Sequence, residues 1–230
     1  MKRLILLIII CSINISAQDF KVDKVSGTVK MLRGTSENWE NVTSGKKLNS
    51  TDLIVTEEKS FIKISNNTTN FVLESNSAID ISKVKNMSMD DLLLALAMED
   101  IRAIPQKDSK SNVKNTAVYG ENKGVEKSVE ATEATSVYLG VKLLNGAKQL
   151  AKSGYKESAL VTARETYRKH PSTLTNFNDR IYFTDILIDL RLFSEANEEL
   201  QSLGKLELSE KNKNQLHSKL EKIKIALLEK

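Results

Sequence analysis

The hydrophobic period of this chain changes once along its length, and that change restricts its fold more than any other feature. Over residues 20–85, short runs rich in Val, Ile, Thr and Phe alternate with turn residues, as in β-strands. Over residues 135–230, apolar side chains recur at helical spacing, and Gly154, Pro171 and Gly204 separate the segments. The sequence therefore predicts an α+β multidomain chain, with a small all-β barrel or sandwich followed by α-helical hairpin repeats.

A Leu-rich segment, residues 88–104, lies between these two parts. Ser88 followed by Asp91 resembles a capping box, and Pro105 ends the pattern, so we expect a helix. Its apolar stripe at helical spacing consists of Leu93, Ala97, Ile101 and Ile104. We expect this stripe to pack against the β part. The alternative is a docking helix for a partner protein.

The next segment, residues 106–134, is polar. It is rich in Lys, Ser, Asn, Glu and Thr and shows no sustained apolar periodicity. A stretch of about 28 residues without a core pattern is unusual inside one compact domain. We therefore expect a mobile linker that separates a β domain, residues 18–105, from a helical domain, residues 135–230.

The N-terminus has the pattern of a targeting segment. Lys2 and Arg3 precede the apolar run Leu4–Ile10, weaker hydrophobicity continues to Ile15, and the sequence Ser-Ala-Gln follows at residues 16–18. This order is typical of a secretory signal peptide, residues 1–17. We expect cleavage after Ala17 and an exported protein that is periplasmic or associated with the outer membrane.

Cys11 offers a second exported route, in which the chain is lipidated. Ile10 is bulkier than the Gly, Ala or Ser that normally precedes a lipidated Cys, so we do not expect this modification. Cleavage after Ala17 removes Cys11, the only Cys of the chain. No later segment approaches the roughly 20 apolar residues of a transmembrane helix.

Charge and composition exclude several function classes. The chain has 34 Lys or Arg and 30 Asp or Glu, a balance that does not favour nucleic-acid binding. One Cys and two His argue against a disulfide framework and a zinc cluster. The sequence contains no Gly-x-Ser-x-Gly, no His-Glu-x-x-His and no phosphate loop. We therefore expect a non-catalytic protein without a metal or cofactor. An enzyme with an unrecognised site is the weakest alternative.

The helical part contains an internal repeat. Ala159 and Ala196 lie 37 residues apart in segments of similar layout. With Ala147, the turn Gly154-Tyr155 and Pro171, this region resembles tetratricopeptide repeats over about residues 136–205, followed by a capping helix. It departs from that family at Leu143, where an aromatic residue is common, and in the missing Pro of the second unit. The resemblance implies peptide or protein binding on a concave face. An unrelated helical bundle is the alternative.

The β part resembles a FecR-like domain over about residues 22–82. The resemblance rests on Val25–Val29, Trp39, Asp52–Thr56 and Ser60–Ile64. Val42 departs from it, because a Leu is usual there. We expect a strand across Gly27, with a bulge or a close backbone approach at that residue. The resemblance implies a non-catalytic β module outside the cytoplasmic membrane.

Four side chains are the candidate partner-binding residues: Trp39, Leu143, Tyr155 and Tyr182. Trp39 would stack on a sugar, anchor a partner or pack in the core. The leading hypothesis is an interaction or scaffold protein of the bacterial cell envelope that binds envelope proteins and acts in signalling or assembly. A cell-wall or glycan-binding module, with peptidoglycan as a ligand, is the alternative.

The C-terminal segment carries a last apolar stripe. Its residues at helical spacing are Leu216, Leu220, Ile223 and Leu227. We expect a helix that closes the repeat array, and self-association through the same stripe is the alternative.

Overall fold

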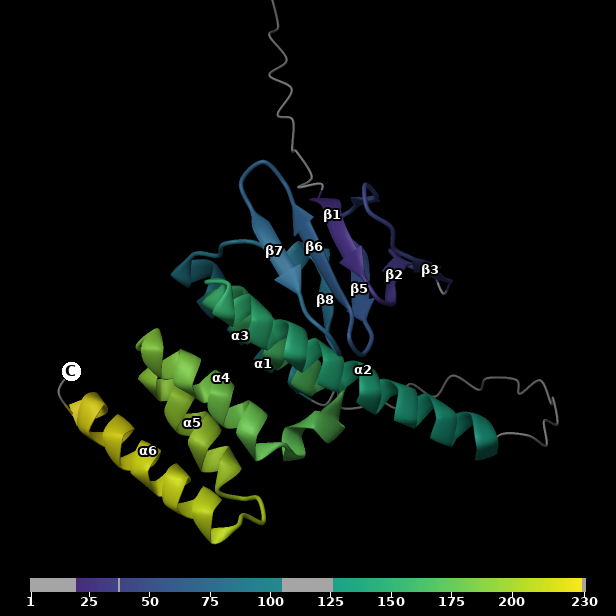
Figure 1. The fold of residues 1–230 in the computed structure, drawn as a ribbon. Coiled ribbons are helices and arrows are strands. Elements are labelled where there is room, and N and C mark those ends of the chain that lie inside the picture. The colour runs from purple at the N-terminus through teal and green to yellow at the C-terminus, as the bar shows by residue number, and fades with distance from the viewer. Residues whose placement is uncertain (1–19, 37, 105–125, 229–230) are drawn as a thin grey trace, which may run out of the picture.

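The computed structural model describes residues 20–36, 38–104 and 126–228. The predicted signal peptide and residues 106–125 of the predicted linker lie outside these ranges. Within them, strands occupy the first part of the chain and helices the rest (Figure 1), which confirms the α+β class.

Eight strands of the described residues form two antiparallel sheets, in the orders β4-β1-β6-β7 and β3-β2-β5-β8. The strands are β1 (Phe20–Ser26), β2 (Val29–Arg33), β3 (Trp39–Asn41), β4 (Lys47–Leu48), β5 (Asp52–Thr56), β6 (Phe61–Ser65), β7 (Asn70–Leu73) and β8 (Ala78–Asp80). Alternate side chains face the core; Val22 and Ile64, for example, pair across β1 and β6 and are both buried. No strand of one sheet pairs with a strand of the other among the described residues, so the barrel is not closed.

The predicted continuous strand across Gly27 is wrong. The chain leaves β1 at Ser26 and enters β2 at Val29, and these strands belong to different sheets. Gly27 has φ +70°, and a Cβ built on it would lie 2.3 Å from Ser60 Oγ. The predicted close approach at this glycine is therefore correct, but it marks a corner between the sheets.

Helix α1 (Met89–Ala103) forms where it was predicted, and its N-cap Ser88 accepts a hydrogen bond from the Asp91 N–H at 3.1 Å. The predicted buried stripe is wrong, because Leu92, Leu96 and Glu99 are buried while the stripe through Ile101 is exposed. The helix packs on α3 (Lys156–Lys169) instead of on the β part.

An ion pair explains the rotation of α1. The buried Glu99 carboxylate accepts hydrogen bonds from Arg168 Nε of α3 at 2.7 Å and from Arg102 Nη1 at 2.5 Å. Because a buried carboxylate needs such partners, this contact places Leu92 and Leu96 inside. The apolar periodicity alone did not distinguish the two faces of the helix.

The remaining helices form two hairpins and a closing helix. After α3 come α4 (Phe177–Asp189), α5 (Phe193–Leu203) and α6 (Glu210–Leu228), and α3 is preceded by α2 (Glu126–Lys152). Short 3₁₀ turns cover Ile81–Lys83 and Pro171–Thr175. Helix α6 packs on α5, and its Leu216 and Ile223 are buried, so the C-terminal stripe closes the array within the chain.

The two hairpins repeat the same geometry at an interval of 37 residues. Gly154 follows α2 with φ +93°, and Arg191 follows α4 with φ +61°. After Gly154, the Tyr155 N–H donates to the Leu150 carbonyl oxygen at 2.9 Å. After Arg191, the Leu192 N–H donates to the Leu187 carbonyl oxygen at the same distance. Ala159 and Ala196, the small residues of the second helices, are both fully buried.

Buried apolar side chains of the strands and of the helices form one hydrophobic core, whereas the sequence led us to expect two domains on a tether. Figure 1 shows α2 running beneath the strands, with α4, α5 and α6 on its other side. A Cβ on Gly146 of α2 would lie 1.9 Å from the Ala78 carbonyl oxygen of β8, so helix and strand are in direct backbone contact.

The start of α2 also corrects the predicted linker. The helix begins at Glu126, so residues 126–134, expected as linker, are helical. This stretch lacks an apolar stripe, but it is rich in Glu and Ala, which have good helix propensity, and it continues a well-packed helix.

Candidate functional site

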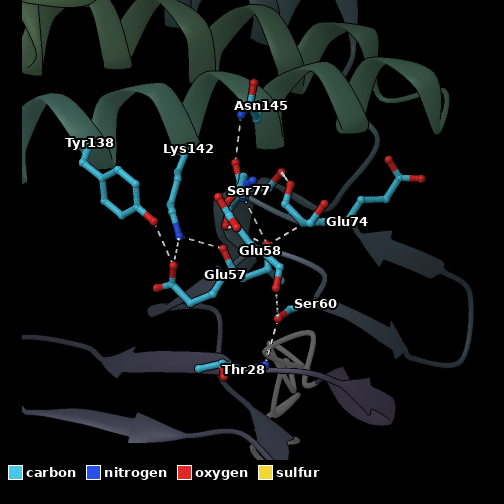
Figure 2. Close-up of polar contacts among 12 residues, drawn as sticks. Thr28, Glu57, Glu58, Ser60, Glu74, Ser77, Tyr138, Lys142 and Asn145 are labelled. Atoms are coloured by element: carbon cyan, nitrogen blue, oxygen red, sulfur yellow. Dashed lines mark hydrogen bonds and ion pairs between the residues drawn. The ribbon is translucent and has the colours of Figure 1, made fainter.

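A polar network joins α2 to the loops of the β part (Figure 2). Lys142 of α2 is only 2% exposed, and its Nζ donates to the Thr56 carbonyl oxygen and to Glu57 Oε2, each at 2.7 Å. The Tyr138 hydroxyl donates to the same Glu57 oxygen at 2.8 Å. The hydrogen bond from Lys142 is the main cause that lowers the pKa of Glu57. A buried ammonium destabilises the fold unless it is paired, and the ammonium of Lys142 is paired with Glu57.

Two amides of α2 complete this junction. Asn145 Nδ2 donates to the Asn76 carbonyl oxygen at 2.8 Å. Gln149 accepts from the Glu74 N–H at 2.6 Å and donates to Ser77 Oγ at 2.7 Å. These groups satisfy loop backbone atoms beside the Gly146 contact. Their role is structural, because they fix the helices on the β part and their hydrogen bonds are made within the chain.

A groove opens between α1 and the helices α3, α4 and α5, and it is the best candidate for a binding site. It is mainly apolar, and its apolar lining is Leu96, Leu160, Ala163, Tyr167, Phe183 and Leu187. Leu96 comes from the N-terminal part of the chain and the others from the helical hairpins. Helix α1 therefore closes one side of a groove that the hairpins form on the others.

Tyr167 carries an unpaired polar group into this apolar site. The side chain is 7% exposed, and its hydroxyl has no hydrogen-bond partner among the described residues. Its ring packs edge-on against Phe183, with centroids 6.4 Å apart. Burial raises the pKa of Tyr167, so the hydroxyl stays protonated and is a donor without an acceptor. Such a group costs about 1–3 kcal/mol when it is left unsatisfied.

Two charged side chains, Arg164 and Glu199, line the polar edge of the groove. Arg180 Nε donates to Glu199 Oε1 at 2.6 Å, and this arginine is 4% exposed, so Glu199 is firmly held. Arg164 is more exposed. Its Nη1 lies 3.6 Å from Glu199 Oε2, and its Nε lies 3.8 Å from Asp100 Oδ1. Both distances exceed a hydrogen bond, so this guanidinium has donors to offer a ligand.

None of the four predicted residues lines this groove. Trp39 is 46% exposed on β3, an edge strand that lies away from α4 (Figure 1). Tyr155 and Tyr182 are half-buried and attach to other elements, Tyr155 to Phe71 and Tyr182 to the Lys148 carbonyl oxygen. Leu143 is half-buried on α2.

Sequence reasoning missed Tyr167, Arg164 and Glu199. Leu160, Arg164 and Tyr167 have the spacing of one helix face, which was visible in the sequence. That spacing does not reveal that α1 from another part of the chain faces it. The lack of a partner for a buried hydroxyl is also a property of the fold alone.

Two further searches cover the described residues. Within them, no group of three or more His, Cys, Asp or Glu side chains is placed to hold a metal ion. None of the helices described is both long enough and apolar enough to cross a membrane. No protein-family model, curated protein or solved structure matches the chain.

Proposed function

We propose that this chain is a non-catalytic, exported interaction scaffold of the bacterial cell envelope that binds a segment of a partner protein in the groove between α1, α3, α4 and α5. The observation that carries the proposal is the unpaired Tyr167 hydroxyl. A Phe would fill the same space without the cost of a buried donor. The hydroxyl itself is buried, so a bound peptide carbonyl would accept its hydrogen bond once the bound segment has widened the groove.

The chemistry of the groove favours a peptide over a charged small molecule. Its apolar lining encloses about 30 Å³, which suits a small aliphatic group, and Arg164 suits a backbone carbonyl or carboxylate at the rim. The repeated hairpins with buried Ala159 and Ala196 support the tetratricopeptide-like interpretation, a class that binds peptides. The turn at Gly27 and the two sheets are compatible with a FecR-like module in a sandwich arrangement.

The binding proposal is tested by selecting peptides from a phage-displayed library on residues 18–230, the expected mature chain. Selected peptides are then titrated against variants by fluorescence anisotropy. We expect peptides with a central apolar residue, and a loss of about tenfold in affinity with Tyr167→Phe, because one hydrogen bond is worth about 1.4 kcal/mol here. Tyr138→Phe, which removes a hydroxyl outside the groove, is the matched control and leaves the affinity unchanged.

Two outcomes would contradict this proposal. One is a selection that yields no peptide above background. The other is a set of peptides that bind wild type, Tyr167→Phe and Tyr138→Phe equally well, because the groove would then not be their site.

Export is tested separately. Cell fractionation followed by mass measurement of the intact protein should recover a chain that begins at Gln18 outside the cytoplasm. A cytoplasmic chain that retains Met1 would refute export without affecting the groove.

The exposure of Trp39 favours glycan binding as a second candidate function. Trp39 is 46% exposed on the edge strand β3, which suits stacking of its indole on a sugar ring. Co-sedimentation with purified peptidoglycan tests it: Trp39→Ala should abolish pelleting, whereas Val72→Ala, at a similarly exposed apolar side chain on β7, should not. Equal pelleting of the two variants would rule out a site at Trp39.

A further inference from the structure

Helix α1 is apolar on two opposite faces. One face carries Leu92 and Leu96, which are buried against the rest of the chain. The other face is exposed and carries Leu94, Ala97, Met98 and Ile101, and the exposed Ile104 follows at the C-cap; Ile101 is 67% exposed. An α-helix turns about 100° per residue, which places Ile101 roughly opposite Leu92 and Leu96. A helix that is apolar all round is normally covered on both sides.

The exposed residues have the spacing of a helix-pairing seam. Leu94 precedes Ala97 and Met98 by three and four residues, and Ile101 follows them by four and three, as do the contact positions of paired helices. Ala97, the smallest of them, stands at the middle of the seam, where a small side chain lets two helices approach closely. The face therefore suits another helix better than a flat surface.

We propose that the exposed face of α1 pairs antiparallel with the same face of a second copy of this chain. The charges at the two ends of α1 select this occupant. Asp90 and Asp91 lie in its first turn and Arg102 lies in its last turn. Arg102 uses Nη1 for Glu99, but its side chain is 54% exposed and keeps further donors for a second carboxylate. An antiparallel pair centred on Ala97 puts Asp91 of one copy beside Arg102 of the other, and two-fold symmetry makes that contact twice. A parallel pair would set the acidic turns together.

The same charges argue against a lipid surface as the occupant. Interfacial helices usually carry Lys and Arg beside the apolar face, to match anionic lipids. On or beside the seam, α1 has Asp90, Asp91 and Asp100 against a single basic residue, Arg102. A negatively charged membrane would repel this helix.

The size of the seam sets the strength of the dimer. A helix of 15 residues is about 22 Å long, so two of them bury less than the roughly 1,200–2,000 Å² of a standard stable interface. We therefore expect reversible, concentration-dependent dimers. Since Leu96 faces the groove from the other side of α1, dimerisation leaves the groove open and is independent of the proposed function.

Sedimentation of residues 18–230 over a range of protein concentrations tests the inference. Wild type should shift from monomer to dimer with rising concentration. Ile101→Glu should raise the dissociation constant at least about tenfold, because it buries a charge in the seam. Ile225→Glu, a matched change at a side chain of α6 that is 57% exposed, should leave dimerisation unchanged.

A cysteine variant tests the antiparallel register. Residues 18–230 contain no Cys, so Ala97→Cys introduces a single thiol. At the centre of an antiparallel pair this thiol meets its own copy, and mild oxidation should give disulfide-linked dimers. Ile225→Cys should give few.

Three results would overturn the inference. They are a wild-type monomer at all concentrations, dimers equally strong in Ile101→Glu, and no enrichment of linked dimers with Ala97→Cys over Ile225→Cys. Binding of wild type, but not Ile101→Glu, to vesicles of phosphatidylethanolamine and phosphatidylglycerol, without dimers, would assign the face to lipid instead.

Discussion

Gly146→Ala gives the sharpest test of the contact between α2 and the β part. In an isolated helix this change would stabilise by about 0.5–1 kcal/mol, because Gly has a poor helix propensity. Here the new Cβ would lie 1.9 Å from the Ala78 carbonyl oxygen, well below the 3.4 Å at which van der Waals contacts begin to be normal. The helix must therefore move away from β8 or distort. We expect Gly146→Ala to lower the free energy of unfolding instead of raising it.

The magnitude follows from what the retreat disturbs. Overpacking a tight contact costs about 1–3 kcal/mol. The hydrogen bonds of Asn145 and Gln149 to the loops flank the glycine, and each is worth about 1 kcal/mol. After the gain in helix propensity is subtracted, we expect a net loss of about 2–4 kcal/mol.

Urea unfolding of wild type and variants, followed by circular dichroism, measures this loss. Gly204→Ala is the matched control: Gly204 has φ −62°, and its Cβ would meet nothing closer than 3.3 Å. We expect that control to lie within about 1 kcal/mol of wild type. A Gly146→Ala variant as stable as wild type, or more stable, would refute the close contact of α2 with β8.

Two further changes test the electrostatics of the helices. Burial raises the pKa of Glu165, but hydrogen bonds from Lys169 and Lys83 outweigh it and lower the pKa from 4.5 to about 2. Because the pKa of Glu165 is lower in the folded state than in the unfolded state, its ionised carboxylate stabilises the fold above about pH 4.5. This stabilisation is lost as the pH falls towards 2. Glu165→Gln should flatten the pH dependence of the unfolding free energy over that window, and an unchanged slope would contradict the pairing. Tyr167→Phe should leave the melting temperature unchanged or raise it, because it removes an unsatisfied hydroxyl; a loss of more than about 1 kcal/mol would show that the hydroxyl is paired.

The sequence predicted local structure well where one face of an element decides it. The β character of the first part, the N-cap at Ser88 and the repeat around Ala159 and Ala196 all follow from short-range patterns. Prediction failed where an element is apolar on two sides, as in α1, because the ion pair of Glu99 with Arg168 decides its rotation.

The candidate site was beyond local patterns for a related reason. Arg164 and Tyr167 are unremarkable helix residues until Leu96, from a distant part of the chain, is placed opposite them. The close contact of Gly146 with Ala78 likewise depends on a pairing between elements far apart in the sequence. The polar segment 106–134 separates the β pattern from the helical pattern, and the sequence alone therefore favours separate domains.

The central claim is that the β part and the helices form one body, since the groove needs α1 and the hairpins together. Unfolding of the wild-type chain by urea, followed at once by two probes, tests it most directly. The only Trp, Trp39, reports on the β part through its fluorescence, and far-ultraviolet circular dichroism reports mainly on the helices. We predict coincident transitions with one midpoint. Two separate midpoints would contradict a shared core and, with it, the groove.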